Sequence, residues 1–386
     1  MIIAKVSAVK NLNLVLIWCP FIDAVTCPPY TRALFSGSTH HYRRIMKKLV
    51  AVTSTLAMVL LTVCGSAQAA DYKPEYRLST VLGPAFPWGK SGERWAELVR
   101  QKTDGRINIK LYSGTVLVGG DQTREFSAIR QGVIDLAIGS SINWSVQVKQ
   151  LNLFSLPFLT PDHKALDALI KGEVGKEIFA ALSQQGVVPL AFGEDGFREL
   201  SNSQHAVKIP TDLDGLKIRV VGSPIFSDAF AALGAIPVQK NWDDLQPALA
   251  SKDVDGQENP LSTFEAARLH TLGQNQLTVW GYMADPLIFA VNKQVWASWS
   301  EADRQAVREA AKQAAEENIA SARRGVSAGD DALLKNIEKN GVTITRLTPS
   351  QRKAFKDATR PVYDKWSVVV GKSLVEKAEA AIKAVK

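Results

Sequence analysis

The chain has 386 residues, of which 46% are hydrophobic and 22% charged, so a globular protein with a substantial core is expected and a disordered chain is excluded. The formal charge of +8 does not indicate a nucleic-acid partner, because seven of the 46 basic residues but only one of the 38 acidic residues fall within the first 70. The remaining 39 basic and 37 acidic residues leave residues 71–386 close to neutral.

The N-terminal region carries the pattern of a secretory signal peptide. Met46 and two lysines are followed by an apolar run at 49–63 and by Ala-Gln-Ala at 67–69, a small-residue cleavage signal. The apolar run is shorter than the ~20 residues that span a bilayer, so the pattern favours a cleaved signal at 46–70 over a retained membrane anchor. We therefore expect export to the periplasm, with translation starting at Met46 and residues 1–45 a mis-called extension.

All three cysteines, Cys19, Cys27 and Cys64, lie in the part of the chain that this cleavage would remove. The mature protein would therefore need no disulfide and would offer no thiol for catalysis. Lipidation of Cys64 is disfavoured, because the bulky Val63 precedes it.

Residues 76–193 alternate between strand and helix patterns. We expect strands at 76–81, 107–112, 135–139 and 187–192, and helices at 88–103, 122–131, 162–171 and 175–185. Pro157 makes the apolar segment at 151–159 an irregular buried stretch. This order predicts an α/β domain with a mostly parallel sheet that helices cover on both faces.

The glycine-rich residues 193–196 are interpreted as a crossover to a second domain. In that domain we expect a strand ending at Val220 and helices at 223–233 and 242–251, before the chain returns to the first domain through a strand at 287–292. A long helix from Ser300 to Asn340, rich in Ala, Glu, Lys and Arg, is expected to brace both domains. A strand at 342–347 and helices at 349–370 and 373–386 complete the chain. The predicted domains are 71–195 plus 285–324, and 196–284 plus 325–386.

Two motifs in the predicted second domain indicate anion binding. Along residues 215–220 (Gly-Leu-Lys-Ile-Arg-Val) apolar and basic residues alternate, which places Arg219 on the non-core face of a strand. In residues 254–260 (Val-Asp-Gly-Gln-Glu-Asn-Pro), Asn259 precedes a proline that bars it from a helix. A fixed guanidinium and a fixed amide are suited to hold a carboxylate.

Motifs for catalysis, metals or cofactors are incomplete in this sequence. No His-Glu-x-x-His or Gly-x-Ser-x-Gly occurs, and the P-loop-like segment around 172–177 lacks its first glycine and its Ser/Thr. The segment at 253–256 resembles a calcium loop only in part, because serines stand at the first and last ligand positions. The three histidines that the mature chain would retain, at 163, 205 and 270, are far apart in the sequence. These features disfavour an enzyme and predict neither a cofactor nor a metal.

Residues 71–386 resemble the solute-binding proteins of tripartite ATP-independent periplasmic (TRAP) transporters, the DctP-like family. The resemblance rests on the two motifs above, together with Thr-Asp-Gly-Arg at 103–106 and Leu-Pro-Phe-Leu at 156–159. It implies a two-domain α/β periplasmic binding protein fold with a hinged cleft and a long bracing helix. It also implies an organic-acid ligand and, as partners, the small and large membrane subunits of the transporter.

By the same resemblance, Arg219 holds the ligand carboxylate and Asn259 contacts the ligand. Arg198 matches a second arginine used by some members; alternatively, it forms a salt bridge with Glu194 or Glu199. One arginine suits a monocarboxylate, whereas two would favour a dicarboxylate or a sugar acid. Flat pocket walls are expected from a set of four tryptophans, although each one singly suits core packing: Trp88, Trp144, Trp242 and Trp280.

The sequence departs from the family pattern at three places. Val221 replaces the proline that commonly follows Arg-Val, residues 118–120 (Val-Gly-Gly) replace a usual Leu-Gly, and Ser140 stands near the acidic residue of sialic-acid binders. A sialic-acid ligand is therefore disfavoured. The alternatives to a TRAP receptor are a periplasmic enzyme acting on a carboxylic acid, and a binding protein for another uptake or sensing system.

Overall fold

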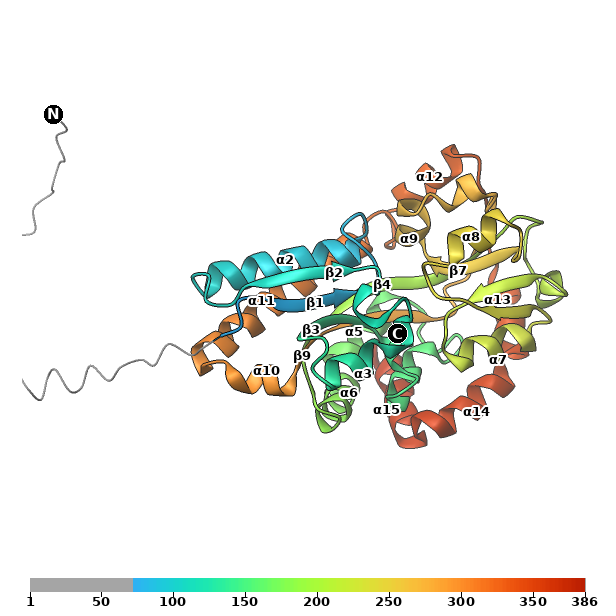
Figure 1. Cartoon of the computed structure of the whole chain (residues 1–386). Coiled ribbons are helices and arrows are strands. Elements are labelled where there is room, and N and C mark those ends of the chain that lie inside the picture. Colours follow the sequence, from blue (N-terminus) through green and yellow to red (C-terminus); the bar gives the residue numbers. More distant parts are fainter. Residues whose placement is uncertain (1–71, 386) are drawn as a thin grey trace, which may run out of the picture. The chain divides into compact units, whose positions relative to one another are not determined.

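The computed structural model describes residues 72–385, so the predicted signal peptide at 46–70 and the extension at 1–45 lie outside the described residues. The described strands form one hydrogen-bonded sheet with the order β2-β1-β3-β9-β4-β7-β5-β6, while β8 pairs with β4 and β10 with β8 (Figure 1). The strands are β1 (Tyr76–Thr80), β2 (Ile109–Ser113), β3 (Leu136–Ser140), β4 (Val187–Asn202), β5 (Lys217–Val220), β6 (Ile236–Gln239), β7 (Gly256–Pro260), β8 (Gln276–Val279), β9 (Ala284–Asn292) and β10 (Thr343–Arg346).

The sheet is mixed, although β1 to β4, the four strands predicted in residues 76–193, all run in the same direction, as predicted. β1 is parallel to β2 and β3, and β5 is parallel to β6 and β7. In the middle of the sheet, however, β9 runs antiparallel to β3 and β4, and β4 runs antiparallel to β7. The reason is that β9 comes from a distant part of the chain and inserts between β3 and β4, a pairing that no local pattern encodes.

The 16-residue strand β4 joins the two parts of the sheet. Residues 187–197 pair with β9, and residues 198–202 pair with β7. Residues 193–196, interpreted as a crossover to a second domain, lie inside this continuous strand, just before it changes partner from β9 to β7. Their glycines permit close packing within the strand, since a Cβ on Gly193 would lie 2.5 Å from Oδ1 of Asn318 and one on Gly196 would lie 3.0 Å from Cβ of Pro260.

The helices include shorter pieces than the sequence patterns suggested. The described α-helices are α2 (Pro87–Lys102), α3 (Glu125–Arg130), α4 (Ser141–Trp144), α5 (His163–Lys171), α6 (Glu173–Gln184), α7 (Pro224–Ala232), α8 (Leu245–Ala250), α9 (Leu261–Ala266), α10 (Lys293–Ser298), α11 (Glu301–Ala322), α12 (Ala332–Lys339), α13 (Pro349–Ala358), α14 (Arg360–Val370) and α15 (Lys372–Ala384). The predicted buried stretch at 151–159 includes part of a buried 3-10 helix, Lys149–Ser155.

Helices cover both faces of the sheet, as predicted. Beside β1–β3, helices α2 and α11 pack together over one face, whereas α3 and α6 lie on the other (Figure 1). Beside β5–β7, α7 belongs to the same apolar core as α3 and α6, while α8 and α9 form a separate core with β8 and α12. These cores support the carboxyl ends of β1 and β3 in one part of the sheet and of β5 and β7 in the other.

Helix α11 packs along α2 and β4 but is shorter than predicted. It ends at Ala322 instead of Asn340, and α12 begins only at Ala332. In the turn between them Gly325 and Gly329 adopt positive φ angles of 77° and 83°, which glycine tolerates without strain. The carboxylate of Asp330 accepts a 2.7 Å hydrogen bond from the backbone N–H of Gly325 and fixes this turn. The sequence pattern predicted one continuous helix because helix-forming residues predominate on both sides of this turn.

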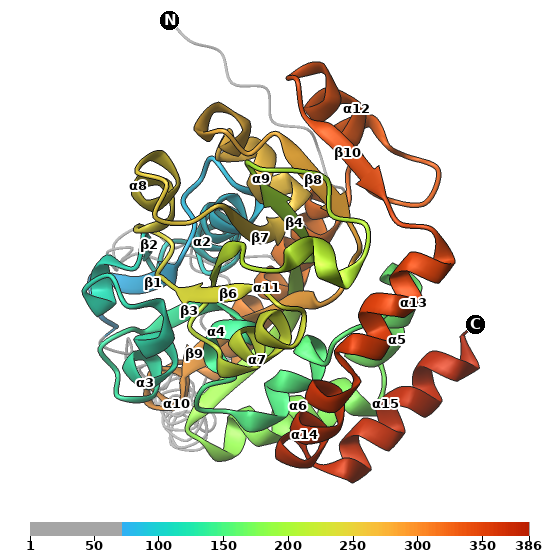
Figure 2. The ribbon, with the colours of Figure 1, turned by 90° about the vertical axis from the view of Figure 1, so that its right-hand side faces the viewer.

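The C-terminal helices contact both parts of the molecule. α15 packs against α5 and α6, and α14 lies between the 3-10 helix Lys149–Ser155 and α7 (Figure 2). The predicted domain boundaries, which assign 325–386 to the second domain, stay a prediction. No helix in the described part of the chain is both long and apolar enough to span a membrane.

Candidate functional site

A small cavity of about 20 Å³ lies where the two parts of the sheet meet. Its walls come from β4 and β9 and from the carboxyl ends of β1, β3, β5 and β7, the usual position of ligand sites in α/β proteins. The lining residues are Val81, Leu82, Trp88, Gln122, Ser140, Asn143, Asp195, Arg198, Arg219, Val221, Trp242, Asn259 and Asp285. Five of the seven predicted site residues are thus brought together.

Arg219 is the most unusual side chain of this cavity. Sequence alternation placed it on a non-core face, yet Arg219 is only 1% exposed. Its Nε donates a 3.0 Å hydrogen bond to the carbonyl of Lys240, whereas its Nη1 has no partner within residues 72–385. Burial lowers the pKa of Arg219 to about 10, so the group is still a cation at neutral pH. A buried cation with an unpartnered donor has the chemistry to attract an anion.

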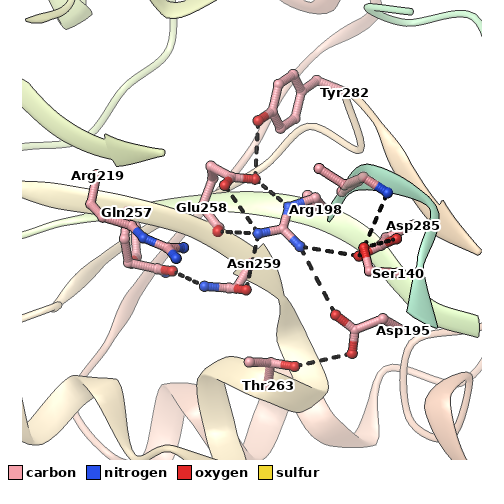
Figure 3. Close-up of polar contacts among 12 residues, drawn as sticks. Ser140, Asp195, Arg198, Arg219, Gln257, Glu258, Asn259, Thr263, Tyr282 and Asp285 are labelled. Carbon is pink, nitrogen blue, oxygen red and sulfur yellow. Dashed lines mark hydrogen bonds and ion pairs between the residues drawn. The ribbon is translucent and has the colours of Figure 1, made fainter. Parts of the chain in front are cut away.

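The positive charge of Arg198, in contrast, is neutralised by neighbouring carboxylates. Its guanidinium forms a bidentate ion pair with Glu258, in which Nη2 lies 3.0 Å from Oε1 (Figure 3). Burial opposes the charge, but Glu258 raises the pKa of Arg198 above its ordinary value. The alternative partners Glu194 and Glu199 are engaged elsewhere, with Arg323 and with backbone N–H groups of Trp280 and Gly281.

Asn259 lies on β7, beside Arg198 of the neighbouring strand β4. Its extended conformation agrees with its position before a proline. Its Oδ1 accepts a 3.0 Å hydrogen bond from Nη2 of Arg198, and its Nδ2 donates to Oε1 of Gln257 (Figure 3). The amide is therefore fixed in orientation by two protein partners. In this arrangement it stabilises the position of Arg198 and forms part of the cavity wall.

Asp195 and Asp285 form an acidic wall on the other side of Arg198, 4% and 2% exposed respectively. Nη1 of Arg198 lies 3.9 Å from Oδ2 of Asp195 and 3.7 Å from Oδ2 of Asp285. Ser140 donates hydrogen bonds of 2.8 Å to Asp285, and Thr263 donates one of 3.3 Å to Asp195. Burial, with the neighbouring carboxylate, raises the pKa of Asp195 to about 7, and burial raises that of Asp285 to about 6.

The four tryptophans divide between the cavity and the core. Trp88 lines the cavity and donates a 2.7 Å hydrogen bond to the carbonyl of Ile138, and Trp242 lines it from the opposite side. Trp144 is buried behind the cavity, where its Nε1 donates to Glu125. Trp280 stacks near Tyr282 and lines a groove of about 740 Å³ on the far side of β4. That groove is lined by Arg323 and Arg352, which a carboxylate and backbone carbonyls already engage, and not by Arg198 or Arg219. We therefore place the candidate site in the smaller cavity.

Several contacts cross the cavity between the two parts of the sheet. Gln122 accepts a 2.8 Å hydrogen bond from the backbone N–H of Trp242, whose ring meets Phe86 edge-on at 5.7 Å. The hydroxyl groups of Ser145 and Ser223 lie 3.0 Å apart. These contacts hold the walls so close that about 20 Å³ remains, roughly the space of one water molecule.

Sequence reasoning missed the acidic members of the site. Glu258 stands inside the quoted motif at 254–260, but nothing local shows that it faces Arg198. Asp195 lies in the segment interpreted as a crossover to a second domain, and Asp285 lies just before a predicted strand. A carboxylate next to a strand end was the only available signal, and it is a weak one.

The model of the DctP family, bacterial extracellular solute-binding protein family 7, matches residues 78–368. The chain belongs to this family, which confirms the resemblance seen in the sequence. A solved TRAP periplasmic solute-binding protein from Ralstonia eutropha, with bound (S)-2-acetolactate, is 62% identical, with a TM-score of 0.81 over 81% of this chain and 100% of that one. Its fold confirms the predicted two-domain periplasmic binding protein class.

More distant relatives carry other acids. The sugar acid binding protein DctPAm from Advenella mimigardefordensis, solved with galactonate, is 26% identical and has a TM-score of 0.76, covering 82% of this chain and 100% of that chain. The C4-dicarboxylate-binding periplasmic protein DctP of Rhodobacter capsulatus is 28% identical over 88% of this chain and 98% of its own length. Relatives of this chain are thus solute-binding proteins for carboxylates and sugar acids rather than enzymes.

Proposed function

We propose that the protein is a periplasmic receptor that captures a small organic acid through Arg219 and delivers it to the membrane subunits of a TRAP transporter. The observation that carries the proposal is the unpartnered Nη1 of a fully buried arginine facing a cavity. A bound carboxylate would accept two charge-assisted hydrogen bonds from this guanidinium and remove the cost of leaving its donor unpaired.

The mechanism that fits this site is closure of the two parts of the sheet around the ligand. The parts are linked by β4 and touch across the cavity through Trp242, Gln122, Ser145 and Ser223. Separation at these contacts would admit the acid, and their return would exclude water from Arg219. The closed form would then be the one that docks on the membrane subunits.

The size of the ligand is suggested by the relative from Ralstonia eutropha. Its bound acetolactate is a compact acid with a single carboxylate. The single uncompensated arginine of this chain agrees with an acid that carries one carboxylate, and we favour a compact acid over a sugar acid. The walls must separate beyond the present volume of about 20 Å³ to admit it.

A thermal-shift screen tests the proposed function. Purified protein lacking residues 1–70 is heated with small monocarboxylates, dicarboxylates, sugar acids and aromatic acids. A ligand that binds the folded state alone at a hundredfold excess over its Kd adds ~2.7 kcal/mol of stability and raises the melting temperature. A small acid should give a clear shift, and neutral amides of the same acids should give none. The proposal fails if no carboxylate shifts the melting temperature.

A further inference from the structure

The charges around the cavity are distributed unevenly between its two arginines. Arg198 lies within 4 Å of three carboxylates, those of Glu258, Asp195 and Asp285. Arg219 forms no ion pair among the described residues, and its Nη1 lacks a hydrogen-bond partner. A ligand therefore finds one cation with a free donor, not two.

The second wall of the cavity offers acceptors instead of donors. Asp195 and Asp285 both line it, and they converge on Nη1 of Arg198 from the side opposite to Glu258 (Figure 3). The neighbouring hydroxyl of Ser140 already donates to Asp285. A group of the ligand that reaches this wall meets carboxylate oxygens with remaining lone pairs, so a hydroxyl can donate to it, whereas a second carboxylate is repelled.

We propose that Asp195 and Asp285 determine ligand specificity, selecting a compact monocarboxylate that carries a hydroxyl near its carboxylate and excluding dicarboxylates. This inference rests on the proposed function, because it places the ligand carboxylate on Arg219. It also answers the question that the sequence left open. Although Arg198 lines the cavity, its positive charge is neutralised by Glu258 and the two aspartates. It therefore does not form a second carboxylate clamp.

Isothermal titration at pH 8, where both aspartates are largely ionised, tests the proposal with three acids of similar size. They are 2-hydroxy-2-methylbutanoate, its methyl-for-hydroxyl analogue 2,2-dimethylbutanoate, and succinate. We expect the wild type to bind the hydroxy acid at least about tenfold more tightly than either of the others, the size of one or more charge-assisted hydrogen bonds. Equal affinity for the hydroxy acid and succinate would overturn the proposal.

Variants then assign the effect to the wall. Asp285→Asn and Asp195→Asn retain side-chain volume but remove a charge, and each should reduce the preference for the hydroxy acid over succinate by about tenfold. Glu125→Gln is the matched control, because Glu125 is a buried carboxylate that does not line the cavity. In Glu125→Gln, the ratio of the Kd for succinate to the Kd for the hydroxy acid should equal the wild-type ratio. An unchanged ratio in both aspartate variants, or an equal change in the control, contradicts the assignment.

The outcomes separate this inference from the proposed function. If the wild type binds the hydroxy acid but does not discriminate against succinate, the acidic wall has no selective role and the receptor function stands. If none of the three acids binds while another carboxylate shifts the melting temperature, the specificity is wrong and the receptor function again stands. If no carboxylate binds at all, both are wrong. The wild-type ratios decide these cases even if an aspartate variant fails to fold.

Discussion

Burial raises the pKa of several carboxyl groups in this protein: to about 7 for Glu125 and Asp195, about 6 for Asp285 and about 8 for Glu199. In the unfolded chain such groups have pKa values near 4. Between about pH 4 and each folded-state pKa, the folded protein holds protons that the unfolded chain has lost. The free energy of unfolding should therefore fall as the pH rises from 5 to 8, and level off above that range.

Glu125 provides a direct test of this dependence. Its carboxyl oxygens accept hydrogen bonds from Ser79 at 2.6 Å and from Trp144 at 3.0 Å, and an amide of the same shape can retain much of this pattern. Glu125→Gln removes the titration, so urea unfolding at pH 5 to 8 should show a shallower decline than the wild type. Glu309→Gln, at an exposed position of α11, is the control and should leave the slope unchanged. An unaltered slope in Glu125→Gln would refute the buried-carboxyl explanation.

The basic half of the site could be predicted from the sequence, and the acidic half could not. Arg219 and Asn259 lie in motifs whose local pattern sets strand and turn, so their positions follow from a few neighbours. Asp195, Glu258 and Asp285 acquire a role only when β4, β7 and β9 lie side by side. Their contribution is a property of tertiary pairing across distant parts of the chain, which alternation of residues does not encode.

At the scale of elements, β4 depends on glycines that let other segments approach its backbone. A methyl group on Gly193 would meet Oδ1 of Asn318 at 2.5 Å and the ring of Phe289 at 2.9 Å. Oδ1 of Asn318 also accepts a 2.8 Å hydrogen bond from the backbone N–H of Glu194. The side chain therefore cannot move away from β4 without losing a buried hydrogen bond. This contact fixes the C-terminal end of α11 against the middle of β4.

We predict that Gly193→Ala lowers the free energy of unfolding by about 1–3 kcal/mol, the usual cost of overpacking a core. Urea unfolding measures the change. Gly83→Ala is the control, because its new Cβ would only touch Oγ of Ser113 at 3.4 Å and the substitution should be nearly neutral. Equal stabilities of the two variants would show that α11 does not pack on β4 as described.

The same contacts explain which elements the sequence predicted well. Helices such as α2 and α5, and strands such as β1, follow local periodicity and were located within a few residues. The predicted strand at 187–192 is shorter than β4, because glycine usually marks a turn, whereas here it permits close packing inside a strand. α11 was extended too far because two glycines among many helix-forming residues gave only a weak stop.

In the whole molecule, the walls of the cavity must separate before a ligand can enter, if binding involves closure of the two parts of the sheet. Ser145 and Ser223, from the two parts of the sheet, have their hydroxyl oxygens 3.0 Å apart, so a disulfide between cysteines at these positions would hold the two parts together. The three native cysteines all lie within residues 1–70, so protein lacking that segment provides a thiol-free background.

The double variant Ser145→Cys/Ser223→Cys should therefore bind ligand normally when reduced and lose ligand exchange when oxidised in the unliganded form. Rapid-mixing tryptophan fluorescence can follow exchange, because Trp88 and Trp242 line the cavity. Each single variant should behave as the wild type under both conditions. Exchange at the wild-type rate in the fully oxidised double variant would rule out closure as the mechanism.

Calorimetric titration of Arg219→Lys with the best acid from the screen tests whether Arg219 holds the ligand carboxylate. Lysine keeps the charge but loses the planar pair of donors, so we predict that the Kd rises about 10- to 150-fold, equivalent to roughly 1.5–3 kcal/mol. Arg106→Lys, whose guanidinium pairs with Asp303 at 2.8 Å away from the cavity, should bind as the wild type does. A Kd for Arg219→Lys within twofold of the wild-type value would contradict the account.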